Sequence, residues 1–317
     1  MIEDVSVIIT CYNEQEYISD AIESVFNQTA FDAIKEIVVV DDGSSDDSKA
    51  VIRPYADSCS KLRYIYQENK GLAVARNTGI RNTTGAHIAL LDGDDLWLEQ
   101  KLEKQLAFLD GNPEVGLLYT DFYAFNGEQR RVYARHFDRE DEDTLEQLFL
   151  HGGPIIPSTA IITRNCLQKV GLFDPELRRA QDTELWLRIA HGWPVHHIGE
   201  PLIRRRNHGN SLGADAEKKS AYLLQITEKI AQRYPGLRPH RRKRVAMIYA
   251  RLARRMALKG KRKKAARAAL RAIRRDISSL EGYLGVMLAI LPLKQSHLQE
   301  IIRLLQGVKR GYKSIMT

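Results

Sequence analysis

Short apolar runs alternate with segments of helical spacing in the first part of the chain, and this alternation restricts the fold more than any other feature. The runs are rich in β-branched residues, as buried strands are. They are Val5–Thr10, Glu36–Val40, Leu62–Gln67 and His87–Leu91, and the helical segments lie near Glu14–Gln28, Ser45–Ala56 and Gly71–Asn82. Such alternation forms parallel βαβ units with right-handed crossovers. We therefore predict an α/β fold whose Rossmann-like, mostly parallel central sheet is flanked by helices.

The pattern continues past this region and changes near residue 235. Further elements of the α/β part are predicted as a helix at Leu98–Leu109, strands at Val115–Ala124 and Thr159–Thr163, and a helix at Asp182–His191. Beyond Pro235 only helical spacing remains, which predicts helices at Arg241–Leu258, Lys261–Arg275, Leu280–Leu291 and Leu298–Lys309. We therefore expect an α/β domain over residues 1–234 and an all-helical region over residues 235–317.

Charge divides the chain at the same place. The formal net charge is +8, but residues 235–317 hold 22 Lys and Arg against 3 Asp and Glu, whereas residues 1–234 hold 26 against 37. Cations that alternate with apolar residues along a helix are typical of helices that lie on an anionic membrane surface. An ordinary solvated face is the alternative interpretation. Nucleic acid is the weaker candidate partner, because no recognised nucleic-acid-binding motif accompanies the charge.

Three sequence features bear on the compartment. Cys11, Cys59 and Cys166 are far apart and show no C-x-x-C spacing, so neither a disulfide framework nor a zinc ribbon is expected. The first residues lack the basic and apolar regions of a secretory signal. The longest apolar stretch, Gly282–Leu293, is shorter than the roughly 20 residues of a spanning helix and contains Pro292. We expect a cytoplasmic protein that could be peripheral at the inner face of the plasma membrane.

Polar residues gather directly after the predicted strands. Thr10–Glu14, Asp41–Ser45 and Asp92–Asp95 follow the first, second and fourth strands. In sheets of this kind, ligands bind at the carboxyl ends of the strands. These three segments therefore predict a composite ligand site.

Asp92, Asp94 and Asp95 place three carboxylates within four residues after a buried strand. Like charges this close favour a bound cation, and oxygen ligands suit Mg²⁺ or Mn²⁺. A solvated acidic turn is the alternative for an isolated D-x-D pair. In the same way, Asp41–Ser45 could hold a nucleotide or form only a glycine turn and a helix cap.

Asn69–Gly79 opens a helix with two glycines and the cations Lys70 and Arg76, which suits a diphosphate lying against the helix start. A Gly-rich helix start alone is weak evidence of a phosphate site. The chain contains neither a Walker phosphate loop nor a G-x-G-x-x-G after a strand, so ATPase and dehydrogenase functions lack their defining motifs.

Five motifs in the first 210 residues resemble, in order and approximate spacing, those of the family-2 inverting glycosyltransferases with the GT-A fold. They are Thr10–Glu14 (TCYNE), Val40–Ser44 (VDDGS), Lys70–Gly79 (KGLAVARNTG), Leu91–Asp95 (LDGDD) and Asp182–Arg188 (DTELWLR). The chain lacks the Q/R-x-x-R-W motif of the family's processive synthases. It is therefore most similar to the non-processive bacterial members.

The resemblance implies a role for each matched residue. Asp182 would be the general base, and the sugar donor would be bound by Thr10, Tyr12, Glu14, Asp42, Lys70, Arg76, Asp92 and Gly93. Asp92, Asp94 and His208 would hold the Mn²⁺ or Mg²⁺ ion, with Asp95 behind them. The family usually has Glu before the base, whereas this chain has Gln181.

The function implied is an inverting transfer of a sugar from a nucleoside diphosphate, with a UDP-sugar favoured. The acceptor would be a hydroxyl of a glycan or lipid-linked glycan in cell-surface glycan biosynthesis. The alternative from another class is a catalytically inactive glycosyltransferase-like scaffold that binds membrane or polyanion through its basic tail. A nucleotidyltransferase is the remote enzyme alternative, because it would need a Gly-rich loop with Arg and Lys where this chain has TCYNE.

Overall fold

The computed structural model describes residues 4–126, 129–133, 144–152, 155–206 and 215–277, together with residue 283. The chain forms two compact units. The first contains Met1–Leu148 and Gly152–Leu212, and the second contains Phe149–His151 and Gly213–Thr317. The division into domains after residue 234 stays a prediction.

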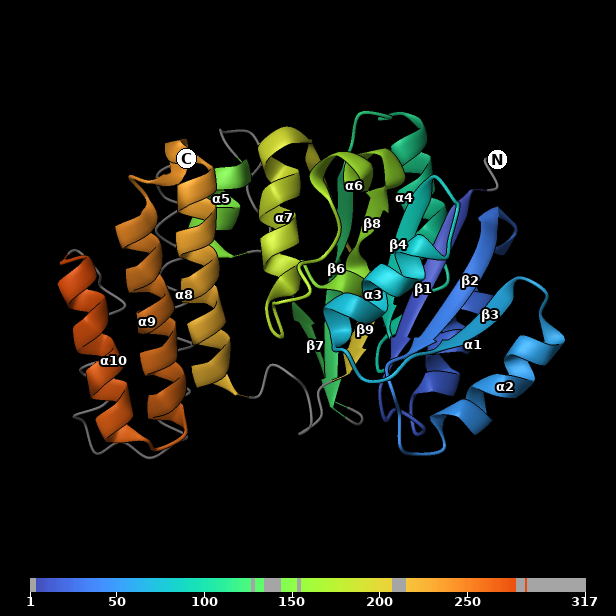
Figure 1. Ribbon diagram of the computed structural model, residues 1–317, viewed down its shortest axis with the longest axis horizontal. Coiled ribbons are helices and arrows are strands. Elements are labelled where there is room, and N and C mark those ends of the chain that lie inside the picture. The colour runs from blue at the N-terminus through green and yellow to red at the C-terminus, as the bar shows by residue number, and fades with distance from the viewer. Residues whose placement is uncertain are drawn as a thin grey trace. The chain divides into compact units, whose positions relative to one another are not determined.

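The first half of the sheet is parallel, as the alternation predicts. Its four strands, in the spatial order β3-β2-β1-β4, are β1 (Val5–Cys11), β2 (Ile34–Asp41), β3 (Leu62–Tyr66) and β4 (His87–Asp92). The crossovers contain α1 (Ile18–Phe26), a short 3₁₀ helix (Phe31–Ala33), α2 (Ser48–Ser58) and α3 (Leu72–Arg81) (Figure 1). All four strands have the ranges expected from the sequence to within two residues at each end.

The second half of the sheet is mixed. β4 continues through β8 (Ile161–Thr163), β6 (Leu117–Asn126), β9 (Val195–Arg206) and β5 (Leu96–Trp97), while β7 (Gln129–Tyr133) pairs with β6. Only the β6–β9 pair is parallel among these. The helical elements that follow along the chain are α4 (Lys101–Asp110), α5 (Thr144–His151), a 3₁₀ turn (Pro157–Thr159), α6 (Arg164–Val170) and α7 (Gln181–Gly192). The last three residues of α5 belong to the second unit. The α/β class with the GT-A-like arrangement is therefore confirmed, with antiparallel pairing added beyond β4.

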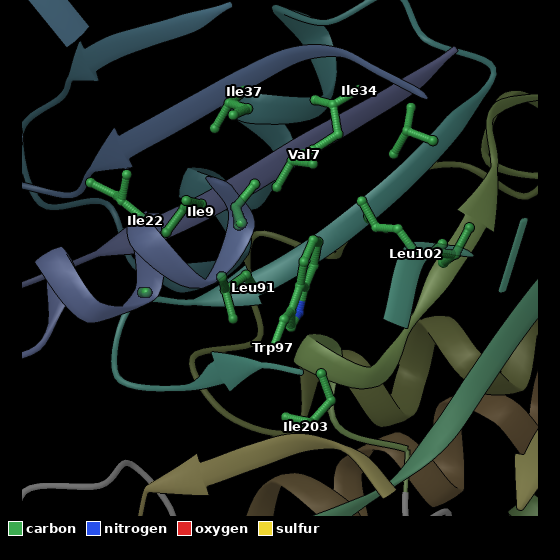
Figure 2. Close-up of a cluster of buried hydrophobic side chains, with 14 of the residues drawn as sticks. Val7, Ile9, Ile22, Ile34, Ile37, Leu91, Trp97, Leu102 and Ile203 are labelled. Atoms are coloured by element: carbon green, nitrogen blue, oxygen red, sulfur yellow. The ribbon is translucent and has the colours of Figure 1, made fainter. Parts of the chain in front are cut away.

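β1 is buried along its whole length, and β2 and β4 are buried along most of theirs, which explains their nearly continuous apolar runs. β3, at the edge of the sheet, is only partly buried. On one face Val7 and Ile9 of β1 meet Ile22 of α1 and Leu102 of α4, and Trp97 fills the space beside them (Figure 2). Burying each such side chain contributes about 1.5–3 kcal/mol. On the other face α3 packs on the sheet.

Close packing of α3 depends on one glycine. A Cβ added to Gly79 would lie 2.3 Å from Cγ2 of Ile8 on β1. Any larger residue would therefore push the helix away from the sheet. Because α3 starts at the carboxyl edge, this packing also fixes the position of its first turn.

Within residues 215–277 of the second unit, three helices run side by side (Figure 1). They are α8 (Ala216–Arg233), α9 (Arg241–Leu258) and α10 (Arg262–Arg275), with a 3₁₀ turn at Pro235–Leu237. Asp215 caps α8 by accepting hydrogen bonds from the N–H groups of Glu217 and Lys218. The buried face of α10 consists of alanines, which allows a close approach to α9.

Three further expectations concern membrane spans, the last helices and the cysteines. No helix among the described residues is long and apolar enough to span a membrane. The helices expected at Leu280–Leu291 and Leu298–Lys309, and the apolar stretch Gly282–Leu293, lie outside the described residues except for residue 283. All three cysteines are free thiols.

Candidate active site

Neighbouring strands bring the ends of three predicted motifs to one edge of the sheet. β1 lies between β2 and β4, and the register pairs Cys11 with Asp41 and Thr10 with Asp92. The hydroxyl of Thr10 lies 3.4 Å from Oδ1 of Asp92. The segments that follow these strands therefore share the carboxyl edge, as the rule for ligand sites in such sheets requires.

The loops after β1 and β2 are hydrogen-bonded to each other. Asn13, in the left-handed conformation with φ 54°, accepts a hydrogen bond from the N–H of Ser45 at 2.8 Å through its side-chain oxygen. Its own N–H donates to Ser44 Oγ, and the N–H of Glu14 donates to Ser48 Oγ. These bonds hold the TCYNE and DDGS segments as one unit. Tyr12 in this unit is 49% exposed, and its contact with a nucleobase stays a prediction.

Asp42 holds the loop that leads into α3. Its carboxylate accepts hydrogen bonds from the backbone N–H groups of Lys70 (2.9 Å) and Gly71 (2.8 Å), and from Nε2 of Gln67 (2.7 Å). The side chain of Lys70 remains exposed. This anchoring is a structural role that the motif did not predict, and the donor contacts of Asp42 and Lys70 stay a prediction.

Arg76 and Asp92 form the central ion pair of the site. Nη2 of Arg76 lies 2.6 Å from Oδ1 of Asp92, and the arginine side chain is only 2% exposed. Its guanidinium also lies over the ring of Phe173, 5.4 Å from the centroid. Nη1 is buried and has no hydrogen-bond partner among the described residues. Because a buried N–H without an acceptor is unfavourable, this donor is suited to a phosphate oxygen.

Glu14 lies against Gly93 in the LDGDD turn. A Cβ on residue 93 would be 2.2 Å from Oε2 of Glu14 and 2.9 Å from the carbonyl oxygen of Thr10, so only glycine fits. Burial raises the pKa of Glu14 well above its usual value, and the charges of Asp94, Asp92 and Asp95 raise it further. Glu14 and Gly93 thus shape the turn, while direct contacts from either to a donor stay a prediction.

Asp95 is buried behind the other two aspartates. Its Oδ2 accepts a hydrogen bond from Ser158 Oγ at 2.7 Å, and its Oδ1 accepts one from the N–H of Arg206 at 3.1 Å. Burial raises its pKa well above the usual value, followed by repulsion from Asp94 and Asp92. The site therefore concentrates negative charge that a cation would offset.

The residues present fit a divalent ion. All hydrogen bonds that the side chain of Asp92 makes among the described residues fall on Oδ1, and Asp94 follows two positions later in the same turn. No three His, Cys, Asp or Glu residues converge on a metal position within the described ranges. Mg²⁺ in proteins is commonly held by one or two carboxylates together with substrate phosphates, which suits this set. His208 lies outside the described residues, so its metal role stays a prediction.

Asp182 lies at the start of α7, where its Oδ1 accepts a hydrogen bond from the N–H of Thr183 at 2.8 Å. The helix is firmly held, because the buried Arg188 pairs with Glu184 and donates to three carbonyl oxygens of residues 170–172. Asn77 of α3 in turn exchanges two hydrogen bonds with the backbone of Phe173. The helix that carries Arg76 is therefore tied to the segment that leads into α7.

Two further arginines contact the site, one in the segment Arg204–Ser211 that also carries His208 and resembles a late motif of the family, the other in no recognised motif. The side chain of Arg206 lies over the rings of Tyr17 and Phe125, pairs with Asp20, and donates through Nε to the carbonyl oxygen of Asp94. Its place in the basic run Arg204–Arg206 was the available signal. The guanidinium of Arg178 lies against Gly71, so close that a Cβ there would be 2.6 Å from Nη1. No motif marks that position.

Comparisons with known proteins agree with the geometry. Residues 6–171, just over half of the chain, match the model of glycosyl transferase family 2. An uncharacterized glycosyltransferase of Rickettsia felis is 34% identical over 230 residues, which is 71% of this chain and 37% of that protein. A protein named as the teichuronic acid biosynthesis glycosyltransferase TuaG of Bacillus subtilis is 29% identical over 71% of this chain and 89% of its own length.

Two solved structures share the fold. Residues 1–349 of S. aureus TarS in complex with UDP-GlcNAc superpose with a TM-score of 0.65 at 20% identity, covering 86% of this chain and 81% of that chain. The mannosyltransferase PcManGT from Pyrobaculum calidifontis, in complex with GDP-Man and Mn²⁺, gives 0.62 at 22% identity, covering 91% and 81%. With a family model matched over more than half of its length, the chain belongs to glycosyl transferase family 2, as its five motifs predict.

Proposed function

We propose that the protein transfers a sugar, with inversion, from a nucleoside diphosphate sugar to an acceptor hydroxyl. A UDP-sugar is the favoured donor. The observation that carries the proposal is the ion pair between the buried Arg76 and the half-buried Asp92 at the carboxyl edge of the sheet. Nη1 of Arg76 has no partner among the described residues, and a second carboxylate, Asp94, follows in the same turn. This set supplies both a cationic donor for a diphosphate and oxygen ligands for a divalent ion.

Each residue of the site would have a separate role in the reaction. Arg76 would hold a phosphate oxygen of the donor through Nη1, and Tyr12 and Thr10 would contact the nucleobase and ribose. Asp182 accepts the proton of the acceptor hydroxyl as that oxygen attacks the anomeric carbon. When bound at Asp92 and Asp94, Mn²⁺ or Mg²⁺ offsets the charge that grows on the departing nucleoside diphosphate. The acceptor oxygen forms its bond to the anomeric carbon on the side opposite the bond that breaks to the diphosphate, so this single displacement inverts the configuration.

Cell-surface glycan assembly is the proposed context, with a glycan or lipid-linked glycan as acceptor at the cytoplasmic face of the membrane. The name of TuaG refers to teichuronic acid biosynthesis, and PcManGT was solved in complex with Mn²⁺. These relatives support glycan synthesis and a divalent ion without fixing the sugar.

The test is a donor panel. Purified protein is incubated with UDP-, GDP- and dTDP-sugars and Mn²⁺ or Mg²⁺, and sugar release is measured together with the thermal shift caused by each free nucleotide. We expect hydrolysis and stabilisation that need a divalent ion and are largest for one nucleotide, with UDP first. The configuration of the first product, followed by NMR, decides inversion. No response to any nucleotide would favour the inactive scaffold instead.

We also propose that α10 binds an anionic membrane surface. Lys263, Arg267, Leu270 and Arg274 follow at intervals of four, three and four residues and are all exposed, opposite the buried alanines of the helix. Leu270 is 50% exposed between these cations. A basic stripe around a large apolar side chain fits a lipid interface, where the cations meet headgroups and the leucine enters the acyl boundary.

Vesicle binding tests this proposal. Replacing Lys263, Arg267 and Arg274 by Glu should weaken binding to vesicles containing phosphatidylserine by at least 100-fold, because each cation near the surface contributes about 1 kcal/mol. The matched control replaces the exposed Lys49, Arg53 and Arg81 of the first unit by Glu, which changes the net charge equally. Equal loss in both triple variants, or tighter binding to RNA than to vesicles, would contradict a specific membrane face.

A further inference from the structure

The 3₁₀ turn Pro157–Thr159 lies next to the LDGDD turn, although more than sixty residues separate them in the sequence. Ser158 at its centre is completely buried. A buried hydroxyl needs hydrogen-bond partners, and those of Ser158 are informative because both belong to the aspartate turn.

Ser158 connects the two ends of that turn. Its Oγ donates to Oδ2 of Asp95 at 2.7 Å and accepts a hydrogen bond from the backbone N–H of Asp92 at 3.1 Å. One hydroxyl thus fixes both the strand end that presents the Asp92 carboxylate and the buried Asp95. Asp94 lies between these two points.

Ser158 is itself held by a rigid support. Its carbonyl oxygen accepts a hydrogen bond from Nε1 of Trp97 at 2.9 Å, and the next carbonyl, of Thr159, accepts one from Nε2 of Gln105 at 3.0 Å. The buried ammonium of Lys101 donates to Oε1 of Gln105 at 2.6 Å and lies 4.0 Å from the Trp97 ring centroid. These three side chains belong to β5 and α4, so the support comes from the packed core.

We infer that Ser158 is a positioning residue for the divalent ion, acting through Asp92 and Asp95. This inference rests on the proposed function, since it assumes that Asp92 and Asp94 bind the ion. Residues that orient metal ligands commonly change metal affinity by 10–100-fold when replaced. Ser158→Ala removes the hydroxyl that restrains the turn, so the carboxylates lose their fixed separation while remaining in the chain.

The chain offers a closely matched control. Ser6, also completely buried, donates through Oγ to Oε1 of Glu36 at 3.0 Å and accepts from the N–H of Gly85 at 2.9 Å. It makes the same pair of bonds at the opposite, amino end of β1. Ser6→Ala therefore removes a similar pair of hydrogen bonds and leaves those of the aspartate turn in place.

The experiment measures Mn²⁺ binding by titration calorimetry in the presence of UDP. It compares the wild-type chain with Ser158→Ala, Ser6→Ala, Asp95→Asn and the double variant Ser158→Ala/Asp95→Asn. We expect Ser158→Ala to weaken Mn²⁺ binding by 10–100-fold and Ser6→Ala to leave it within about twofold, with both lowering the thermal midpoint. The double variant should bind Mn²⁺ no more weakly than the single variant with the lower affinity, because the effects of substitutions within one hydrogen-bonded network are not additive.

Wild-type Mn²⁺ affinity in Ser158→Ala would overturn the inference while leaving the proposed function intact. Equal weakening in both serine variants would show a general stability effect and would also overturn it. A wild-type chain that binds no Mn²⁺ with UDP would remove the proposed metal site and the inference together.

Discussion

Asp182→Asn should lower turnover by about 10²–10⁴-fold while donor binding stays near the wild-type value. A positioned general base contributes a factor of this size, and an amide cannot take the proton of the acceptor hydroxyl. The variant should fold normally, because the side-chain oxygen of Asn can still accept the hydrogen bond from Thr183, and Arg188 holds α7 independently. Steady-state kinetics with the preferred donor, together with nucleotide binding by thermal shift, measures both quantities.

The control for this variant is Asp57→Asn, which makes the same change at an exposed position of α2. It should leave turnover unchanged. Retained turnover in Asp182→Asn would assign the base to another residue. A parallel loss of nucleotide binding would instead show that Asp182 holds the donor.

The parallel half of the fold could be predicted because its inner strands are buried on both faces. A strand such as β1, which is buried at every position, must then be mostly apolar and β-branched, and this pattern is visible without any tertiary information. β9 shows the opposite case. It is twelve residues long, but its sequence VHHIGEPLIRRR is half polar and contains Pro201, at a point where its register with β6 shifts. Strands of this kind depend on partners that the sequence does not identify.

The same distinction applies to the candidate site. The rule that ligands bind at strand ends placed Thr10, Asp42 and Asp92 at one edge, because that prediction needs only the order of the strands. The contacts that fix them could not be predicted. Asn13 forms a hydrogen bond with Ser45, and Ser158 forms one with Asp95. These are common turn residues, and no local sequence pattern distinguishes such side chains from polar side chains that are simply solvated.

The basic region shows what charge alone can predict. The periodicity placed α9 over residues 241–258, where the structure has it, and indicated a basic face on α10. It did not reveal that α8 belongs to the same compact unit as α9. α8 holds four Lys and Arg against two Glu, whereas α9 holds seven Lys and Arg and no Asp or Glu, so their charges do not indicate that they belong together. Packing, which groups helices by their buried faces, is independent of the charges on their exposed faces.

Asp94→Asn should lower metal-dependent turnover by about 10²–10³-fold, because ligand loss removes a few kcal/mol of the stabilisation that a divalent ion gives to the leaving group. In the absence of metal, the same variant should be slightly more stable than the wild type. Asp94 raises the pKa of both Glu14 and Asp95, so its charge opposes their ionised forms in the folded protein. Steady-state kinetics with Mn²⁺ measures the turnover, and thermal unfolding with and without Mn²⁺ and UDP measures the stability.

We therefore expect the order of the two unfolding temperatures to reverse when ligands are added. Without ligands the wild type should unfold at the lower temperature, and with Mn²⁺ and UDP it should unfold at the higher one, since a ligand that binds only the folded state stabilises it. Asp110→Asn, at an exposed position of α4, is the control and should follow the wild type in both conditions. If Mn²⁺ and UDP stabilise Asp94→Asn as much as the wild type, Asp94 does not hold the ion. The charge gathered at this edge of the sheet would then need another physical explanation.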